Sequence, residues 1–156
     1  MPQSHRLVCI NISRDLCLKL IERRAMPPDQ LSGSMRFLST AAENLYQELN
    51  EPTGVPVVGL ARDITVKLVE LNLVGSVQAA AVALAENGRM VAEVASQLDT
   101  KTAPPALKTA RDLTLKMLET GRLGRNSLPA LFEELAVSVS EKAARRDENG
   151  SVEARL

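Results

Sequence analysis

The sequence SRDLCLKLIE at Ser13–Glu22 returns as ARDITVKLVE at Ala61–Glu70 and as ARDLTLKMLE at Ala110–Glu119. Arg, Asp, Lys and Glu keep the same places in each copy, and the residues between them are apolar, Thr or Cys. Self-similarity at a nearly fixed period is the signature of a repeat architecture. We therefore expect three versions of one structural unit, which would occupy residues 13–60, 61–109 and 110–146.

The repeated motif predicts a helix, although its alternation of apolar and polar residues would also suit a half-buried strand. In each copy an Asp precedes a Lys by one helical turn, as Asp15 precedes Lys19, and such pairs stabilise only a helix. We expect the Asp near the start of its helix, where the helix dipole favours a negative charge. A positive charge at a helix start is mildly unfavourable, so we expect Arg14, Arg62 and Arg111 to contact a neighbouring repeat or subunit.

A helix breaker follows each motif at one common distance. These breakers are Pro27, Gly75 and Gly124. Proline lacks an amide donor and glycine tolerates positive φ, so both residue types end helices. The pattern predicts that each repeat is a helical hairpin.

The second helix of each hairpin is marked by an apolar stripe at spacings of three and four residues. We expect these helices at about residues 29–50, 76–98 and 127–146. Ser76 and Ser127 are suitable N-caps, and Pro129 suits a first turn. The stripe expected for the third repeat consists of Leu128, Leu131, Leu135 and Val139.

These patterns predict an all-α protein with about six main helices in three consecutive hairpins, stacked as a short solenoid or folded into a compact bundle. Residues 1–12 would form an N-terminal arm, in which 6–13 is either a short strand or a backward extension of the first helix. Residues 13–146 would form one helical domain, followed by a polar, disordered tail at 147–156. A single hairpin cannot bury its stripe, so we expect a homo-oligomer.

Composition limits the classes of function. The formal net charge is zero, with basic residues in excess in 1–36 and 101–130 and acidic residues in excess elsewhere. A dedicated nucleic-acid surface is usually net basic, so the balance argues against a free-standing DNA binder. Two cysteines and no secretory pattern suggest a reducing, bacterial-type cytoplasm. No apolar stretch is long enough to span a membrane.

Neither a catalytic nor a metal site can be assigned. His5, Cys9 and Cys17 are the only soft metal ligands, and no fourth candidate lies near them in the sequence. The sequence contains one histidine, so it does not indicate a catalytic pair of nucleophile and base. The glycines do not cluster into a phosphate-binding loop. We expect no enzymatic activity, no metal and no cofactor.

The third repeat resembles a known family. The sequence ARDLTLKMLETGRLGRNSLPALFEELAVSVSEK is similar to the helical N-terminal region of Ros/MucR-type bacterial regulators, with the match carried by Leu128, Pro129 and Leu131. The resemblance implies self-association. The zinc finger with which that family reads DNA has no counterpart, because no Cys-x-x-Cys or Cys-His framework follows the hairpin.

We therefore expect a non-enzymatic helical module for oligomerisation or protein–protein interaction, with itself and an unidentified protein as partners. The alternative is a DNA-binding regulator or accessory protein, in which a basic N-terminal strand and two helices resemble a ribbon-helix-helix arm. Its candidate DNA contacts are Arg6, Asn11, Arg14, Arg23 and Arg24.

Overall fold

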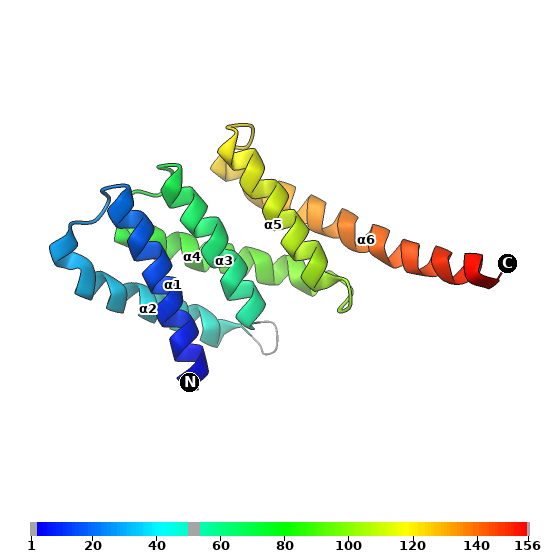
Figure 1. The fold of residues 1–156 in the computed structure, drawn as a ribbon, viewed down its shortest axis with the longest axis horizontal. Coiled ribbons are helices and arrows are strands. Elements are labelled where there is room, and N and C mark those ends of the chain that lie inside the picture. Colours follow the sequence, from blue (N-terminus) through cyan, green and yellow to red (C-terminus); the bar gives the residue numbers. More distant parts are fainter. Residues whose placement is uncertain (1–2, 50–53, 156) are drawn as a thin grey trace. The chain divides into compact units, whose positions relative to one another are not determined.

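The computed structural model describes residues 3–49 and 54–155. This part of the chain contains six α-helices and no strand, which confirms the predicted all-α class (Figure 1). The helices are α1 (Gln3–Glu22), α2 (Leu31–Glu48), α3 (Gly54–Glu70), α4 (Val77–Ser96), α5 (Ala103–Glu119) and α6 (Leu128–Arg155). Short 3-10 helices at Pro28–Gln30 and Arg125–Ser127 lead into α2 and α6.

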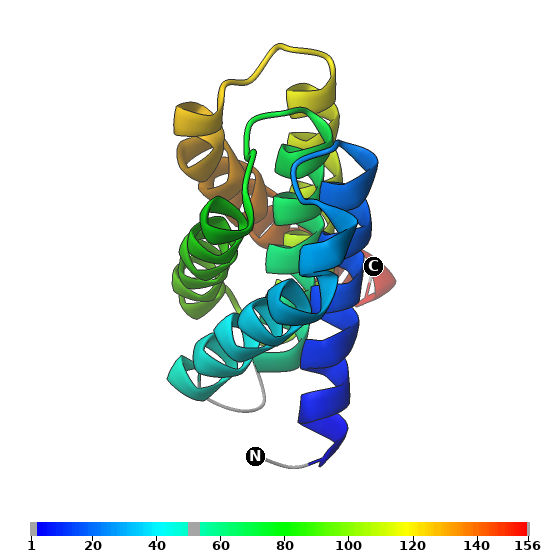
Figure 2. The same cartoon turned by 90° about the vertical axis from the view of Figure 1, so that its left-hand side faces the viewer.

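The chain divides into two compact units, Met1–Ala92 and Glu93–Leu156. In the first unit α1 packs against both α2 and α3, and α2 and α4 lie on one side of the α1 and α3 pair (Figure 2). In the second unit α5 packs against α6. The division falls inside α4, so it differs from the single domain expected over residues 13–146.

The first helix corrects one expectation. Because α1 runs without interruption from Gln3 to Glu22, the strand considered for residues 6–13 is wrong and the backward extension of the helix is right. Its buried residues include Cys9, Ile12 and Leu16, which recur at the period of a helix face. Residues 3–12 of the expected arm therefore belong to α1, and residues 1–2 lie outside the described part.

Contrary to our expectation, the motif does not lie at the start of its helices. Proline lies in or next to the first turn of α3 and α5, which begin at Gly54 and Ala103, well before the motif. The motif aspartates consequently lie in the C-terminal halves of these helices, and the helix dipole does not account for them. The motif lysines pair with the glutamate three residues later, at 3.1 Å in Lys19–Glu22 and 3.2 Å in Lys67–Glu70.

The small residues of the motif face the protein interior. Thr65 Oγ1 donates a hydrogen bond to the Ala61 carbonyl oxygen at 2.7 Å, and Thr114 Oγ1 does the same to Ala110. Thr65 also accepts a hydrogen bond from the Asn87 amide of α4 at 3.0 Å, which links the two helices of the second hairpin. Two motif positions are buried in all three copies, the first (Ser13, Ala61 and Ala110) and the fifth (Cys17, Thr65 and Thr114).

The third hairpin differs from its prediction in the rotation and length of α6. Its buried side chains are Leu128, Phe132, Ala136 and Ser140, at a spacing of four, whereas Leu131, Leu135 and Val139 are only partly buried. The helical backbone continues to Arg155, through the segment expected as a disordered tail. Leu156 lies outside the described residues.

The turns between paired helices repeat one backbone geometry. Arg24, Asn72 and Gly121 occupy the same place after the three motifs, and each has positive φ, at 58°, 62° and 75°. The amide after each bonds to a carbonyl five residues earlier, as in Ala25 N to Leu20 O at 2.8 Å. This is the Schellman arrangement, in which a left-handed residue ends a helix. The three breakers predicted from the sequence follow these residues.

One turn stores strain that a substitution can relieve. Arg24 adopts φ of 58°, a conformation that glycine reaches without the steric cost of a Cβ. We expect Arg24→Gly to raise the free energy of unfolding by about 0.5–1 kcal/mol. Gly121→Ala should lower it by about 1 kcal/mol, because the Cβ meets open space and only the backbone conformation is penalised. Thermal unfolding monitored by circular dichroism measures both changes. Equal shifts of the melting temperature in the same direction would contradict the left-handed conformation of these two residues.

Candidate functional site

The motif arginines form a repeated set of surface ion pairs. In each repeat the arginine Nε donates to Oδ1 of the next residue at 3.0 Å, in Arg14–Asp15, Arg62–Asp63 and Arg111–Asp112. Arg62 also extends Nη1 to Asp15 Oδ2 of the first repeat, at 3.5 Å. The arginine of the second repeat thus bridges to the first repeat within the chain.

The candidate DNA contacts do not form one reading element. Arg6, Asn11 and Arg14 are exposed on α1, whereas Arg23 and Arg24 lie in the turn after it. Arg23 Nε donates to Asn72 Oδ1 at 3.2 Å, so it joins two successive turns. A ribbon-helix-helix arm needs a strand at this end of the chain, and α1 is helical there from Gln3.

The residues considered as metal ligands lie apart or in the core. Within residues 3–49 and 54–145, no group of three or more His, Cys, Asp and Glu side chains is arranged to hold a metal ion. The His5 ring lies against the Tyr46 ring of α2, with centroids 4.6 Å apart and planes tilted by 30°. Cys9 and Cys17 are free thiols, and both are buried.

The burial of the two thiols makes a chemical prediction. Burial raises the pKa of Cys9 to about 11, with a further contribution from the charge of Glu43, and burial also raises the pKa of Cys17. Because the thiolate is the reactive form, we expect a thiol reagent near pH 8 to label the native protein about a hundredfold more slowly than the denatured chain. Rapid labelling of two thiols per native chain would contradict the packing of α1.

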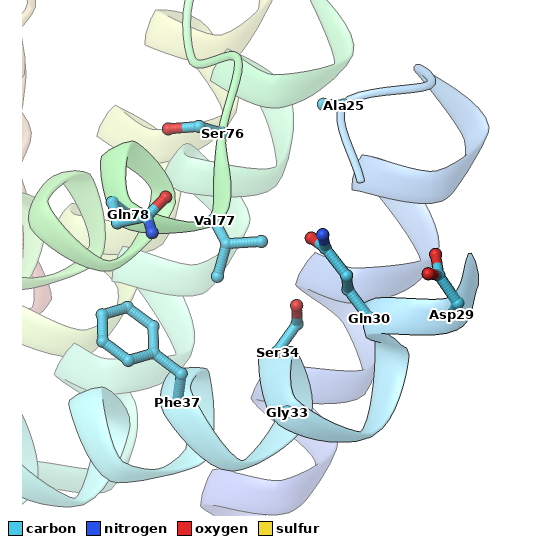
Figure 3. A pocket seen from close by; sticks show the side chains of 9 residues that line it. All are labelled: Ala25, Asp29, Gln30, Gly33, Ser34, Phe37, Ser76, Val77 and Gln78. Atoms are coloured by element: carbon cyan, nitrogen blue, oxygen red, sulfur yellow. The ribbon is translucent and has the colours of Figure 1, made fainter. Parts of the chain in front are cut away.

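A hollow surface lies between α2 and α4 in the first unit. Two depressions, of about 490 and 370 Å³, are lined by residues of these two helices, and no residue lines both. Figure 3 shows Phe37 of α2 and Val77 of α4 directed toward the space between them. We name this surface the α2–α4 groove. It is lined along its length by Phe37, Ala41, Leu45 and Glu48 of α2 and by Val82, Ala85, Glu86 and Arg89 of α4.

The groove combines exposed apolar side chains with one ion pair. Phe37 and Val82 are 48% and 55% exposed. At the far end Arg89 donates two hydrogen bonds to the carboxylate of Glu48, at 3.1 and 3.2 Å, and this lowers the pKa of Glu48. Sequence reasoning missed the groove because it followed only the buried stripe of α2. Phe37, which lies outside that stripe, was the available signal.

Comparison with known proteins returned no relative. Models of protein families, curated proteins and solved structures were all searched, and none matches the chain. None of the helices in the described ranges is both long and apolar enough to cross a membrane.

Proposed function

We propose that this protein is a non-enzymatic helical module for protein–protein interaction, which binds an amphipathic helix of another protein in the α2–α4 groove. The observation that carries the proposal is the exposure of a large apolar side chain in each depression between α2 and α4, Phe37 in the first and Val82 in the second. Large apolar side chains rarely remain grouped on the surface of a protein without a binding role.

The shape of the groove supports a helical partner. Its walls are two helices of 18 and 20 residues, so it is long and narrow rather than enclosed. Such grooves bind the apolar face of a partner helix, through anchors spaced by three, four and seven residues. The Glu48 and Arg89 pair at one end offers a carboxylate and a cation to the polar edge of that helix. Self-association, which the family resemblance implies, belongs to the same class of function.

The test is comparative capture from lysate of the native cells, with Phe37→Asp/Val82→Asp as the groove variant. Leu73→Asp is the matched control, because Leu73 is also an exposed apolar residue but lies in the turn between α3 and α4. We expect a protein that wild type and control retain, and that the groove variant retains at least tenfold less. Equal capture by all three chains, with all three folded by circular dichroism, would refute the proposal.

A further inference from the structure

The contact between α1 and α3 shows how two successive repeats pack. Arg62 of α3 pairs with its neighbour Asp63 at 2.9 Å and reaches Asp15 of α1 at 3.5 Å. Val58, one turn before Arg62 on α3, is fully buried. Figure 1 shows α1 and α3 side by side, and the two helices pack against each other. We take Val58 and Arg62 to mark the face of α3 that meets the preceding repeat.

The first helix presents the equivalent face to solvent. In the motif alignment Ile10, Arg14 and Leu18 of α1 take the places of Val58, Arg62 and Val66 of α3. Ile10 and Leu18 are 43% and 59% exposed, and the side chain of Arg14 is 57% exposed. Arg14 already makes the contact with its neighbouring aspartate that Arg62 makes with Asp63. This face of α1 thus has the composition of a contact between repeats.

The complementary face is exposed on α5. Asp112 and Leu113 take the places of Asp15 and Leu16, of which the first receives Arg62 and the second is fully buried. The side chain of Asp112 is 62% exposed, and Leu113 is 46% exposed. The last motif therefore offers to solvent the aspartate and leucine that the first motif uses within the chain.

We propose that two copies of this chain associate head to tail, with α1 of one copy packed on α5 of the other as α3 packs on α1. Arg14 of one copy then reaches Asp112 of the second, and Ile10 and Leu18 cover Leu113. Burial of the apolar side chains contributes most of the stabilisation, because an exposed ion pair adds little. The inference rests on the proposed function as an interaction module but uses a different surface from the α2–α4 groove.

Head-to-tail contact predicts growth rather than a closed pair. The two faces differ, so every added copy leaves one α1 face and one α5 face open, unless the chain of copies closes into a ring. We expect the mass of the wild-type protein to rise with concentration beyond that of a dimer. Light scattering after size-exclusion chromatography, together with sedimentation velocity, measures this rise.

Mixing two variants tests the geometry. Leu18→Glu blocks the α1 face and Leu113→Glu blocks the α5 face, so each variant alone should be a monomer. An equimolar mixture retains one compatible pair of faces and should form a dimer with one copy of each chain. The control Leu73→Glu should associate like the wild type. A wild type that stays monomeric, or a mixture that stays monomeric beside an associating wild type, would overturn the inference.

A charge exchange provides a second test that leaves the apolar residues in place. Arg14→Asp and Asp112→Arg each place like charges together and should weaken association severalfold, whereas the chain carrying both substitutions should recover it. Weakening without recovery would count against the assigned pair. Loss of head-to-tail association with groove-dependent capture intact would overturn this inference alone. Loss of capture with association intact would overturn only the function proposed for the groove.

Discussion

Replacing Phe132 with alanine is expected to lower the free energy of unfolding by about 3–5 kcal/mol. Phe132 is fully buried in α6 and is among the largest buried side chains of the chain. Its loss removes the transfer free energy of an aromatic ring and leaves a cavity that neighbouring helices fill only in part. Urea denaturation followed by circular dichroism measures the change.

The chain supplies its own control for this substitution. It contains two phenylalanines, and the other, Phe37, is 48% exposed on α2. Phe37→Ala should therefore cost less than about 1 kcal/mol. Similar losses for Phe37→Ala and Phe132→Ala would show that the side chain of Phe132 does not anchor α6 as the structure places it.

The second large effect is expected where α2 and α4 approach closely. A Cβ on Gly88 would lie 2.5 and 2.6 Å from the two terminal carbons of Leu45, which is 1% exposed. Overpacking of this kind costs about 1–3 kcal/mol, partly offset by about 1 kcal/mol of gained helix propensity. We expect Gly88→Ala to lower the free energy of unfolding, and Leu45→Ala to lower it by about 2–5 kcal/mol.

Combining the two substitutions should reverse the sign of the stability change that Gly88→Ala causes. In a chain that carries Leu45→Ala, the methyl group of Gly88→Ala enters vacated space and should be neutral or stabilising. Gly59→Ala is the matched control, because no atom lies within 4 Å of its Cβ, and it should stabilise α3 by up to about 1 kcal/mol. Additive losses from Gly88→Ala and Leu45→Ala in chemical denaturation would contradict the close contact.

The existence and pairing of the helices could be predicted from sequence, because periodicity and breakers are local signals. The positions of Pro27, Gly75 and Gly124 located the three turns within the hairpins. Ser76 caps α4 as expected, since its Oγ accepts a hydrogen bond from the Ala79 amide at 3.0 Å. Ser127 instead ends the short 3-10 helix that leads into α6.

Helix starts and rotations were less predictable, because they depend on contacts between distant segments. The helix dipole suggested a helix start at Asp15, but α1 begins at Gln3 and Arg62 of the next repeat reaches Asp15. In α6 the leucines Leu131 and Leu135 outweighed Phe132 in the apparent stripe, although packing buries Phe132. Hydrophobic periodicity determines that a helix has an apolar side, and tertiary packing decides its orientation.

The candidate surfaces were predicted only in part. The motif arginines were expected to contact a neighbouring repeat or subunit; Arg62 reaches Asp15 of the first repeat, and the subunit contacts stay a prediction. Phe37 indicated an apolar position outside the buried stripe, but the α2–α4 groove could not be located from it, because the groove requires two helices from different repeats to lie together. Phe37 and Val82 are 45 positions apart in the sequence, and no local pattern in either segment indicates that their two helices are neighbours.

The stacking of His5 on Tyr46 gives the chain a built-in optical reporter. Tyr46 is the only tyrosine, there is no tryptophan, and the ring is 4% exposed in the first compact unit. Tyrosine emission therefore follows the environment of residues 1–92, whereas the far-ultraviolet signal sums over every helix. If the two units melt independently, the two spectroscopic curves will separate, and the fluorescence curve alone will belong to the amino-terminal unit.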